Sequence, residues 1–260
     1  MDSGQIKRDE PTEHIVRLTL SRPKKLNSFD RSMLDQLDGA LTTLEKDKLT
    51  RAVILAAEGG KAFCAGADIN AWSSLEPLDM WREWIADGNR LFDRLARLRQ
   101  PVIAAIDGIA YGGGLELALC ADIRIASEGS RFALPETAVG TIPGWSGMRR
   151  LVKLIGLSRA KRMVLTGEPV SSREALEAGL ITTVVESDVL AQEAEALAST
   201  IATRAPLAIQ MAKGMLDQAA DEEPGHAIQG FASAVTAFSA DGKEGIAAFT
   251  EKREARFDGR

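Results

Sequence analysis

Short apolar runs alternate with longer segments of helical periodicity through the first half of the chain, and this alternation restricts the fold more than any other feature. The runs RAVILAA (residues 51–57) and PVIAAIDG (residues 101–108) are almost continuously apolar, as expected of strands covered on both faces. Residues 31–47 and 78–98, which precede these runs, carry apolar side chains at the spacing of amphipathic helices. The pattern predicts an α/β fold in which helices pack on sheets.

Further strands and helices are predicted around these elements. A helix is expected to begin near Gly113, and after about residue 146 the pattern becomes mostly helical. From residue 187 to residue 256 only helical periodicity remains, broken at Pro206 and Pro224. We therefore expect a core over residues 1–200 and a helical C-terminal oligomerisation region over residues 201–260. The remaining predicted strands are residues 14–20, 123–127, 131–134 and 180–185.

Composition narrows the class of protein. The chain has 260 residues, of which 45% are hydrophobic, and a net charge of -5, so it lacks the basic balance that nucleic-acid binding requires. The polar N-terminus does not resemble a signal peptide, and no apolar run approaches the ~18 residues of a membrane span. Cys64 and Cys120 lie in apolar runs without disulfide or zinc spacing, which favours buried thiols. We expect a cytoplasmic protein without a metal site.

Several catalytic motifs are absent from the sequence. It contains no phosphate-binding loop, no dinucleotide-binding glycine motif and no zinc-protease motif. His14 and His226 are the only histidines, and neither has the surroundings of a catalytic triad. Any catalysis is therefore expected to depend on other groups.

The run AYGGGLELALCAD (residues 110–122) places three glycines directly before an acid in an apolar segment. Glycines between a strand and a helix permit close approach of a ligand, and the first amides of a helix have no intrahelical partner. Such amides can stabilise a developing oxyanion, and Glu116 lies about one turn into the helix. In the alternative interpretation Glu116 only caps the helix and the glycines serve tight packing.

Two other segments strengthen the catalytic interpretation. KAFCAGADI (residues 61–69) leaves a strand through small residues, so an amide near Ala67 can supply a second oxyanion donor. RFALPETAVGTIPGWSG (residues 131–147) places Glu136 before glycine-rich backbone. Taken alone, residues 61–69 are explained equally well as a plain strand-to-helix connection. Taken alone, Glu136 is explained as an exposed acid of a loop. Together they indicate a pair of carboxylates that divide acid and base roles.

These segments, taken together, resemble the crotonase superfamily, the enoyl-CoA hydratases and isomerases. The resemblance rests on GGGLELALCADIRIAS, KAFCAGADI and FALPETAVGTIPG, and continues through LSRPKKLNSFD, GLITTVV and EGIAAFTEKREARF, covering roughly residues 14–257. It implies a crotonase-like spiral of ββα units with a helical C-terminal region, assembled as trimers that often pair into hexamers. It also implies an acyl-CoA substrate, with CoA entering as part of the substrate and no metal or redox cofactor.

The resemblance assigns roles to residues of this chain. The oxyanion donors are the main-chain N–H groups of Ala67 and Gly113, and the two hydratase glutamates fall on Glu116 and Glu136. Glu116 is expected to activate water, and Glu136 to deliver a proton to C2, although both acids can instead hold the same water. Gly144 matches a glycine beside the reactive water.

Coenzyme A contacts also follow from the resemblance. Lys24 and Lys25 lie in the loop where the family contacts the nucleotide end, although a solvated loop explains them equally well. The segment with Ala65, Asp68 and Ile69 matches the stretch along the adenine and pantetheine path. Phe249 and Lys252 match residues that reach the CoA from a neighbouring subunit, with helix packing and a solvated helix face as the alternatives.

Two departures from the family pattern, and several alternative functions, remain open at the sequence level. Asn70 replaces a lysine that hydratases often have, and Trp145 stands where many hydratases carry a small residue, so it either reshapes the acyl pocket or packs in the loop.

The resemblance implies that an isomerase generally lacks an acid matching Glu116, so hydration is favoured. A specialised acyl-CoA dehydratase, an RNA-binding member and a non-catalytic scaffold are the other possibilities.

Overall fold

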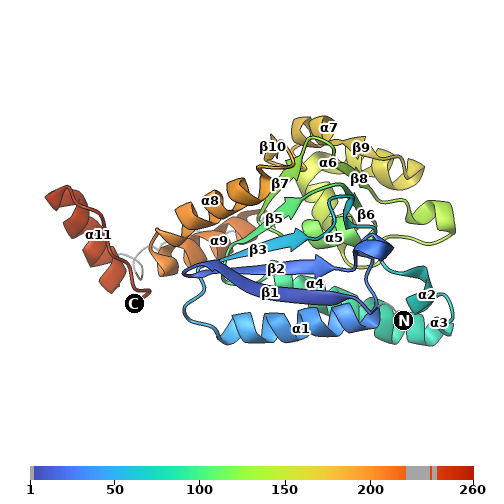
Figure 1. Cartoon of the computed structure of the whole chain (residues 1–260), viewed down its shortest axis with the longest axis horizontal. Helices are drawn as coiled ribbons and strands as arrows, with labels where there is room; N and C mark the ends of the chain where they lie inside the picture. Colours follow the sequence, from blue (N-terminus) through green and yellow to red (C-terminus); the bar gives the residue numbers. More distant parts are fainter. Residues whose placement is uncertain (1–2, 221–234, 236–238) are drawn as a thin grey trace.

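The computed structural model describes residues 3–220, 235 and 239–260, and its strands form two sheets (Figure 1). In the six-stranded sheet the first two strands are antiparallel and all other neighbours are parallel. Its order is β1 (Gln5–Thr12), β2 (Ile15–Ser21), β3 (Ala52–Ala57), β5 (Val102–Ile106), β7 (Ile123–Ser127) and β10 (Thr183–Val185). The four-stranded sheet has the order β4 (Ala62–Cys64), β6 (Ile109–Tyr111), β8 (Arg131–Ala133) and β9 (Val170–Ser171).

A repeated unit links the two sheets. In each of the pairs β3–β4, β5–β6 and β7–β8, the first strand joins the large sheet and the second joins the small sheet. Helical segments follow each pair, so the chain advances as a spiral of ββα units. This arrangement confirms the predicted α/β, crotonase-like fold class.

Helices cover both faces of the large sheet, which explains why its strands are apolar on both sides. On one face, alternate residues such as Val53 and Leu55 pack with α1 (Arg31–Lys46) and α4 (Ala86–Ala96) in the main core. On the other face, Ile54 and its neighbours pack against α8 (Leu190–Ala202) (Figure 1). The remaining long helices are α6 (Gly147–Thr166), which is kinked at Gly156, α9 (Pro206–Ala220) and α11 (Ala240–Glu251).

Short helical segments lie between these elements, and several of them border the site described below. They are η1 (Pro23–Lys25), α2 (Ile69–Trp72), α3 (Pro77–Asp79), η2 (Met80–Ile85), α5 (Gly113–Ala118), η3 (Glu136–Val139) and α7 (Ser172–Glu177). The predicted helix over residues 78–98 is observed as the continuous run α3, η2 and α4, in which η2 is a π-helical turn. Such turns occur mostly inside α-helices and frequently at functional sites.

Several predicted boundaries are wrong. The sequence did not predict β1, because its residues are mostly polar; it is an edge strand with most side chains exposed. His14 has a φ of 69° and precedes β2, so the strand predicted over residues 14–20 begins one residue later. The strand predicted over residues 101–108 ends at Ile106, because Gly108 (φ 74°) turns the chain toward the second sheet.

The described C-terminal part contains the helices α9 and α11, but helical structure ends at Glu251 rather than at residue 256 as predicted, and residues 253–260 are not helical. α9 begins at Pro206, as predicted, whereas the break at Pro224 and the residue His226 lie outside the described residues. α11 projects from one end of the molecule, opposite the end that carries α2 and α3 (Figure 1). The proposed division at residue 200 stays a prediction.

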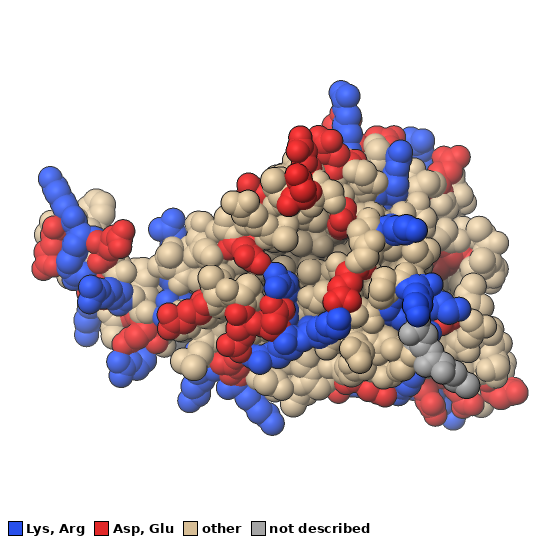
Figure 2. Space-filling model, viewed as in Figure 1, with Lys and Arg blue, Asp and Glu red and all other residues tan. Residues whose placement is uncertain are grey.

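Two other properties complete the description. Cys64 and Cys120 are both buried free thiols, as predicted, and burial raises the pKa of each to about 12. On the face drawn in Figure 2, basic and acidic side chains are interspersed. Across residues 3–220, 235 and 239–260, we find no helix with the length and apolar character needed to span a membrane.

Candidate active site

Each of the three glycines that begin α5 leaves room for a different neighbour. A Cβ atom on Gly112, whose φ is 51°, would lie 2.9 Å from Oε1 of Glu136. A Cβ atom on Gly113 would lie 2.7 Å from the Trp145 ring, and one on Gly114 would lie 2.1 Å from the Cys64 carbonyl oxygen. The glycine run therefore lets three separate segments meet at the start of this helix.

The Glu116 carboxylate is fixed by amides of a distant loop. The residue is 2% exposed, and its Oε1 accepts hydrogen bonds from the N–H groups of Trp145 (2.8 Å) and Gly147 (2.9 Å). α5 has no side-chain cap, so the capping interpretation of Glu116 is wrong. Burial raises the pKa of Glu116, and the amides together with the nearby charge of Arg150 oppose that rise.

Glu136 lies in a different environment. It is the first residue of η3, directly after Pro135, and is half-buried. Its Oε2 atom is buried and has no hydrogen-bond partner within the described residues. Burial raises the pKa of Glu136 to about 7, and the charge of Glu116 adds to this effect. A carboxyl with these surroundings favours its protonated form near neutral pH, whereas the amides around Glu116 favour a carboxylate.

The two expected oxyanion donors are close together. Phe29 and Ala67 form a parallel β-bridge, in which the Phe29 amide donates to the Gly66 carbonyl and the Asp68 amide donates to the Phe29 carbonyl. This pattern leaves the Ala67 N–H outside the bridge. The Gly113 N–H is the first of α5 and has no intrahelical partner. A Cβ atom on Gly113 would lie 3.5 Å from the Ala67 nitrogen, so both amides border the same space.

A cavity of about 270 Å³ brings most of the predicted site residues together. Both acids and both expected donors line it, as do Trp72 from α2 and Met80 and Trp84 from η2. The predicted residues in its wall are Ala65, Ala67, Ile69, Gly113, Glu116, Glu136 and Gly144. Sequence analysis did not single out the apolar Ile85, Val139 and Ile142, because isolated apolar side chains carry no chemical signal.

The loop with Lys24 and Lys25 runs beside the first oxyanion segment. The Ala65 amide donates to the Leu26 carbonyl at 2.9 Å, which ties the two loops together. Lys24 borders a separate hollow of about 270 Å³, and Lys61, which sequence analysis did not select, lines it too. Lys25 is exposed on the same turn. Both lysines therefore lie outside the main cavity, on the loop that is hydrogen-bonded to the segment with Ala65 and Ala67.

The Asp68 side chain is engaged within the protein. Its carboxylate forms an ion pair with Arg22 at 2.8 Å and accepts hydrogen bonds from the main-chain and side-chain N–H groups of Asn70. It thereby caps α2 and fixes the segment that carries Ala67. Asn70, which replaces the lysine expected at this position, takes part in that cap.

Phe249 and Lys252 do not join this cavity within one chain. Phe249 lies on α11 and is 88% exposed, and Lys252 ends the same helix with a φ of 53°. The helix is at the opposite end of the molecule from α2, which borders the cavity (Figure 1). Their predicted role requires a second copy of the chain.

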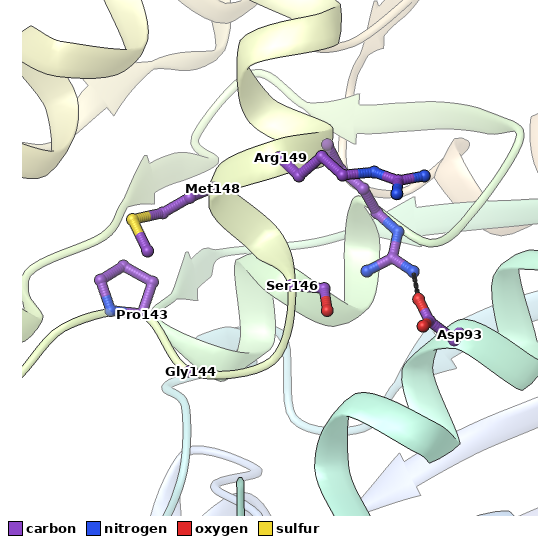
Figure 3. A pocket seen from close by; sticks show the side chains of 7 residues that line it. Asp93, Pro143, Gly144, Ser146, Met148 and Arg149 are labelled. Atoms are coloured by element: carbon purple, nitrogen blue, oxygen red, sulfur yellow. Dashed lines mark hydrogen bonds and ion pairs between the residues drawn. The ribbon is translucent and has the colours of Figure 1, made fainter. Parts of the chain in front are cut away.

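A second hollow is lined by residues 143, 144 and 146 of the loop whose amides contact Glu116 (Figure 3). It has a volume of about 360 Å³ and shares Gly144 with the main cavity. Inside it, Arg150 forms an ion pair with Asp93 at 2.5 Å and donates to the Trp145 carbonyl at 3.4 Å. Arg150 therefore supports from outside the same loop whose amides contact Glu116.

Comparisons with known proteins agree with this geometry. The sequence pattern of the enoyl-CoA hydratase/isomerase family matches residues 10–260. The chain is 37% identical over 242 residues to a short-chain enoyl-CoA hydratase of Clostridium acetobutylicum, covering 92% of both proteins. It is 34% identical over 250 residues to a crotonyl-CoA hydratase of Syntrophomonas wolfei, covering 95% of this chain and 96% of the relative.

Solved structures show the same relationship. The crystal structure of an enoyl-CoA hydratase from Bacillus anthracis superimposes with a TM-score of 0.94 at 37% identity, over 98% of this chain and 99% of that chain. A second, from Geobacillus kaustophilus, gives a TM-score of 0.92 at 35% identity over the whole of both chains. This chain belongs to the enoyl-CoA hydratase/isomerase family.

Proposed function

We propose that the protein is an enoyl-CoA hydratase, a hydro-lyase that adds water reversibly and with syn geometry to 2-trans-enoyl-CoA thioesters to give 3-hydroxyacyl-CoA. The observation that carries the proposal is the pairing of Glu116 and Glu136 in one cavity beside two convergent amides. Relatives with hydratase names, at 34–37% identity over most of the chain, support the same activity.

In the proposed reaction the two glutamates transfer protons and the two main-chain amides stabilise the enolate. The Glu116 carboxylate removes a proton from water while the water oxygen attacks C3 of the substrate. Electrons of the double bond move onto the thioester oxygen, which accepts hydrogen bonds from the Ala67 and Gly113 amides. Glu136 then donates its proton to C2 as the enolate collapses. In dehydration the same steps run backwards, and Glu136 removes the proton from C2.

The two environments support this division of roles. The amides of Trp145 and Gly147 and the charge of Arg150 favour the ionised form that a base requires, and they oppose burial, which raises the pKa of Glu116. Glu136 has a buried oxygen without a partner in the described chain, which favours the protonated form that an acid requires. Oxyanion donors accelerate the reaction because they bind the enolate more tightly than the ground-state thioester, and one such donor typically contributes about 3–4 kcal/mol.

The proposal also covers substrate, assembly and location. CoA enters as part of the substrate, and the chemistry uses no metal or redox cofactor. Lys24, Lys25 and the segment around Ala65, Asp68 and Ile69 contact the CoA. A homotrimer or homohexamer brings Phe249 and Lys252 of one copy to the CoA of another, and the enzyme acts in the cytoplasm.

A panel of 2-trans-enoyl-CoA thioesters tests the proposal. Purified protein is expected to remove the ultraviolet absorbance of the conjugated thioester and to form the 3-hydroxyacyl-CoA. A parallel assay with 3-enoyl-CoA measures isomerase activity, and a mobility-shift assay at low salt measures RNA binding. Isomerisation or RNA binding without hydration of any thioester in the panel would contradict the proposal.

A further inference from the structure

We propose that the indole of Trp145 closes the inner end of the acyl cavity and restricts this enzyme to short, uncharged enoyl groups. The inference rests on the proposed hydratase function and deepens it by naming the class of acyl group. It follows from the packing around the indole, the depth profile of the cavity and the charge of its walls.

The indole is held in one position by other aromatic rings. Trp145 is 2% exposed, and its ring centroid lies 5.0 Å from Phe92, 5.5 Å from Trp84 and 6.0 Å from Phe29. The edge-to-face geometry with both phenylalanines is a favourable aromatic arrangement. The indole N–H donates to the Trp84 carbonyl at 3.3 Å, which fixes the remaining direction of rotation.

Two glycines on opposite sides of the indole show that no spare volume surrounds it. A Cβ atom on Gly88 of α4 would lie 2.0 Å from Nε1, and one on Gly113 of α5 would lie 2.7 Å from Cζ3. The ring therefore fills the space between the two helices. Because Gly113 supplies an oxyanion donor, this filled space lies directly beside the reacting thioester.

Exposure along the cavity wall locates its closed end. Trp145 and Trp84 are buried, Met80 and Ile85 are half-buried, and Ile142 at the rim is 64% exposed. The cavity thus deepens toward the two tryptophans and stops there. Its volume of about 270 Å³ lies below the range of about 300–1,000 Å³ typical of pockets for drug-sized ligands.

The charge of the wall excludes a second class of substrate. Glu116 and Glu136 are the only ionisable residues in the wall within the described chain. An acyl group that ends in a carboxylate would meet two acids and no cation inside the cavity. Repulsion and loss of hydration both disfavour such a group.

The experiment compares kcat/KM for four-carbon and ten-carbon 2-enoyl-CoA in wild type, Trp145→Ala and Trp145→Phe. Wild type is expected to prefer the four-carbon substrate at least tenfold. Removal of the indole should shift the ratio toward the ten-carbon substrate at least tenfold, and Trp145→Phe should shift it less. Trp145→Ala keeps the main-chain amide that holds Glu116, so the shift reports on the side chain.

Trp81→Ala is the matched control. Trp81 is 65% exposed and lies on the same π-helical turn as Trp84, but it does not line the cavity. Its substitution should leave the chain-length ratio unchanged. A four-carbon enoyl-CoA that carries a terminal carboxylate completes the panel and should react at least 100-fold more slowly than crotonyl-CoA.

The outcomes separate this inference from the proposed function. No hydration of any thioester by wild type contradicts the function itself. Hydration of four-carbon and ten-carbon substrates with equal kcat/KM by wild type overturns the inference, even if neither variant folds. An unchanged ratio in a folded Trp145 variant, or rapid turnover of the carboxylated substrate, overturns it as well.

Discussion

The main-chain N–H of Trp145 donates a 2.8 Å hydrogen bond to Oε1 of Glu116, and this bond joins two segments that are 29 residues apart. Gly147 donates to the same oxygen at 2.9 Å. The expected base is therefore oriented by the loop that enters α6 as well as by its own helix. The bond also places the Trp145 indole beside Gly113, the expected oxyanion donor.

Gly147→Ala tests whether this loop orients the base. A Cβ atom at this position would lie 2.3 Å from Cγ of Glu116 and 2.7 Å from Oε1, so the carboxylate must move. We expect kcat to fall by about 100-fold, since a displacement of about 1 Å at a catalytic group can cost that much. Steady-state kinetics with crotonyl-CoA measure the change.

Gly39→Ala is the control for this substitution. Gly39 is an exposed residue of α1 with no atom within 4 Å of the added Cβ, and alanine is the better helix former. It should leave kcat unchanged and stabilise the protein slightly. Equal kcat values for the two alanine variants would show that the loop does not orient Glu116.

Gly114→Ala tests the close approach of α5 to β4. The new Cβ atom would lie 2.1 Å from the main-chain carbonyl oxygen of Cys64, which cannot move without displacing the strand. We expect the free energy of unfolding to fall by about 3 kcal/mol, the upper end of the usual cost of overpacking. Denaturant unfolding measures it. Gly129→Ala, at an exposed position with open space, should be nearly neutral, and a comparable loss in both variants would argue against the contact.

The pH dependence of kcat/KM follows from the proton shared by the two acids. In the proposed mechanism hydration begins with Glu116 ionised and Glu136 protonated, and the pKa of Glu136 is raised to about 7. Above this pH the proton is lost, so kcat/KM for hydration should fall about tenfold per pH unit. Dehydration starts from the same total of one proton on the pair, so its profile should have the same shape.

Initial rates with crotonyl-CoA and with 3-hydroxybutyryl-CoA, measured from about pH 5 to about pH 9, provide the comparison. An added buffer that does not bind the protein should leave both profiles unchanged at constant ionic strength. A hydration rate that stays constant through the alkaline range would mean that no acid in the site must remain protonated.

Glu136→Gln should stabilise the fold at alkaline pH. The folded-state pKa of Glu136 is raised to about 7 from its ordinary value of 4.5, so the folded protein binds more protons than the unfolded chain between these values. The carboxyl therefore does not change the free energy of unfolding below about pH 4.5. Its destabilising effect grows as the pH rises and is complete above about pH 7. We expect Glu136→Gln to raise the free energy of unfolding by about 1–2 kcal/mol at pH 8 and much less at pH 5.

Thermal or denaturant unfolding at both pH values measures this difference. Glu168→Gln, at a side chain that is 67% exposed, is the matched control and should show no such pH dependence. If Glu136→Gln lowers stability equally at both pH values, burial does not raise the pKa of this carboxyl.

The sequence predicted best those elements whose residue types directly reflect their place in the fold. The apolar runs at residues 51–57 and 101–108 predicted strands because both faces of the large sheet are covered, and AYGGGLELALCAD predicted the start of α5. The polar strand β1 escaped prediction because an edge strand needs few apolar residues. Its pairing with β2 depends on main-chain hydrogen bonds, which any sequence supplies.

The candidate site was only partly predictable for a related reason. Glu116 and Glu136 carry a chemical signal, so sequence analysis selected both. The amides of Trp145 and Gly147 that hold Glu116 carry none, since every residue except proline has an N–H. The packing of the Trp145 indole against Phe29 and Phe92 joins positions 116 and 53 residues apart, and only the tertiary fold brings them together.

The convergence of the two acids is tested most directly by the initial rate of crotonyl-CoA hydration in wild type, Glu116→Gln and Glu136→Gln. Glutamine keeps the size of the side chain but cannot take up or give the catalytic proton. We predict that each substitution lowers kcat by about 100- to 10,000-fold while KM changes little. Near wild-type rates in both folded variants would contradict a mechanism that uses this pair of glutamates.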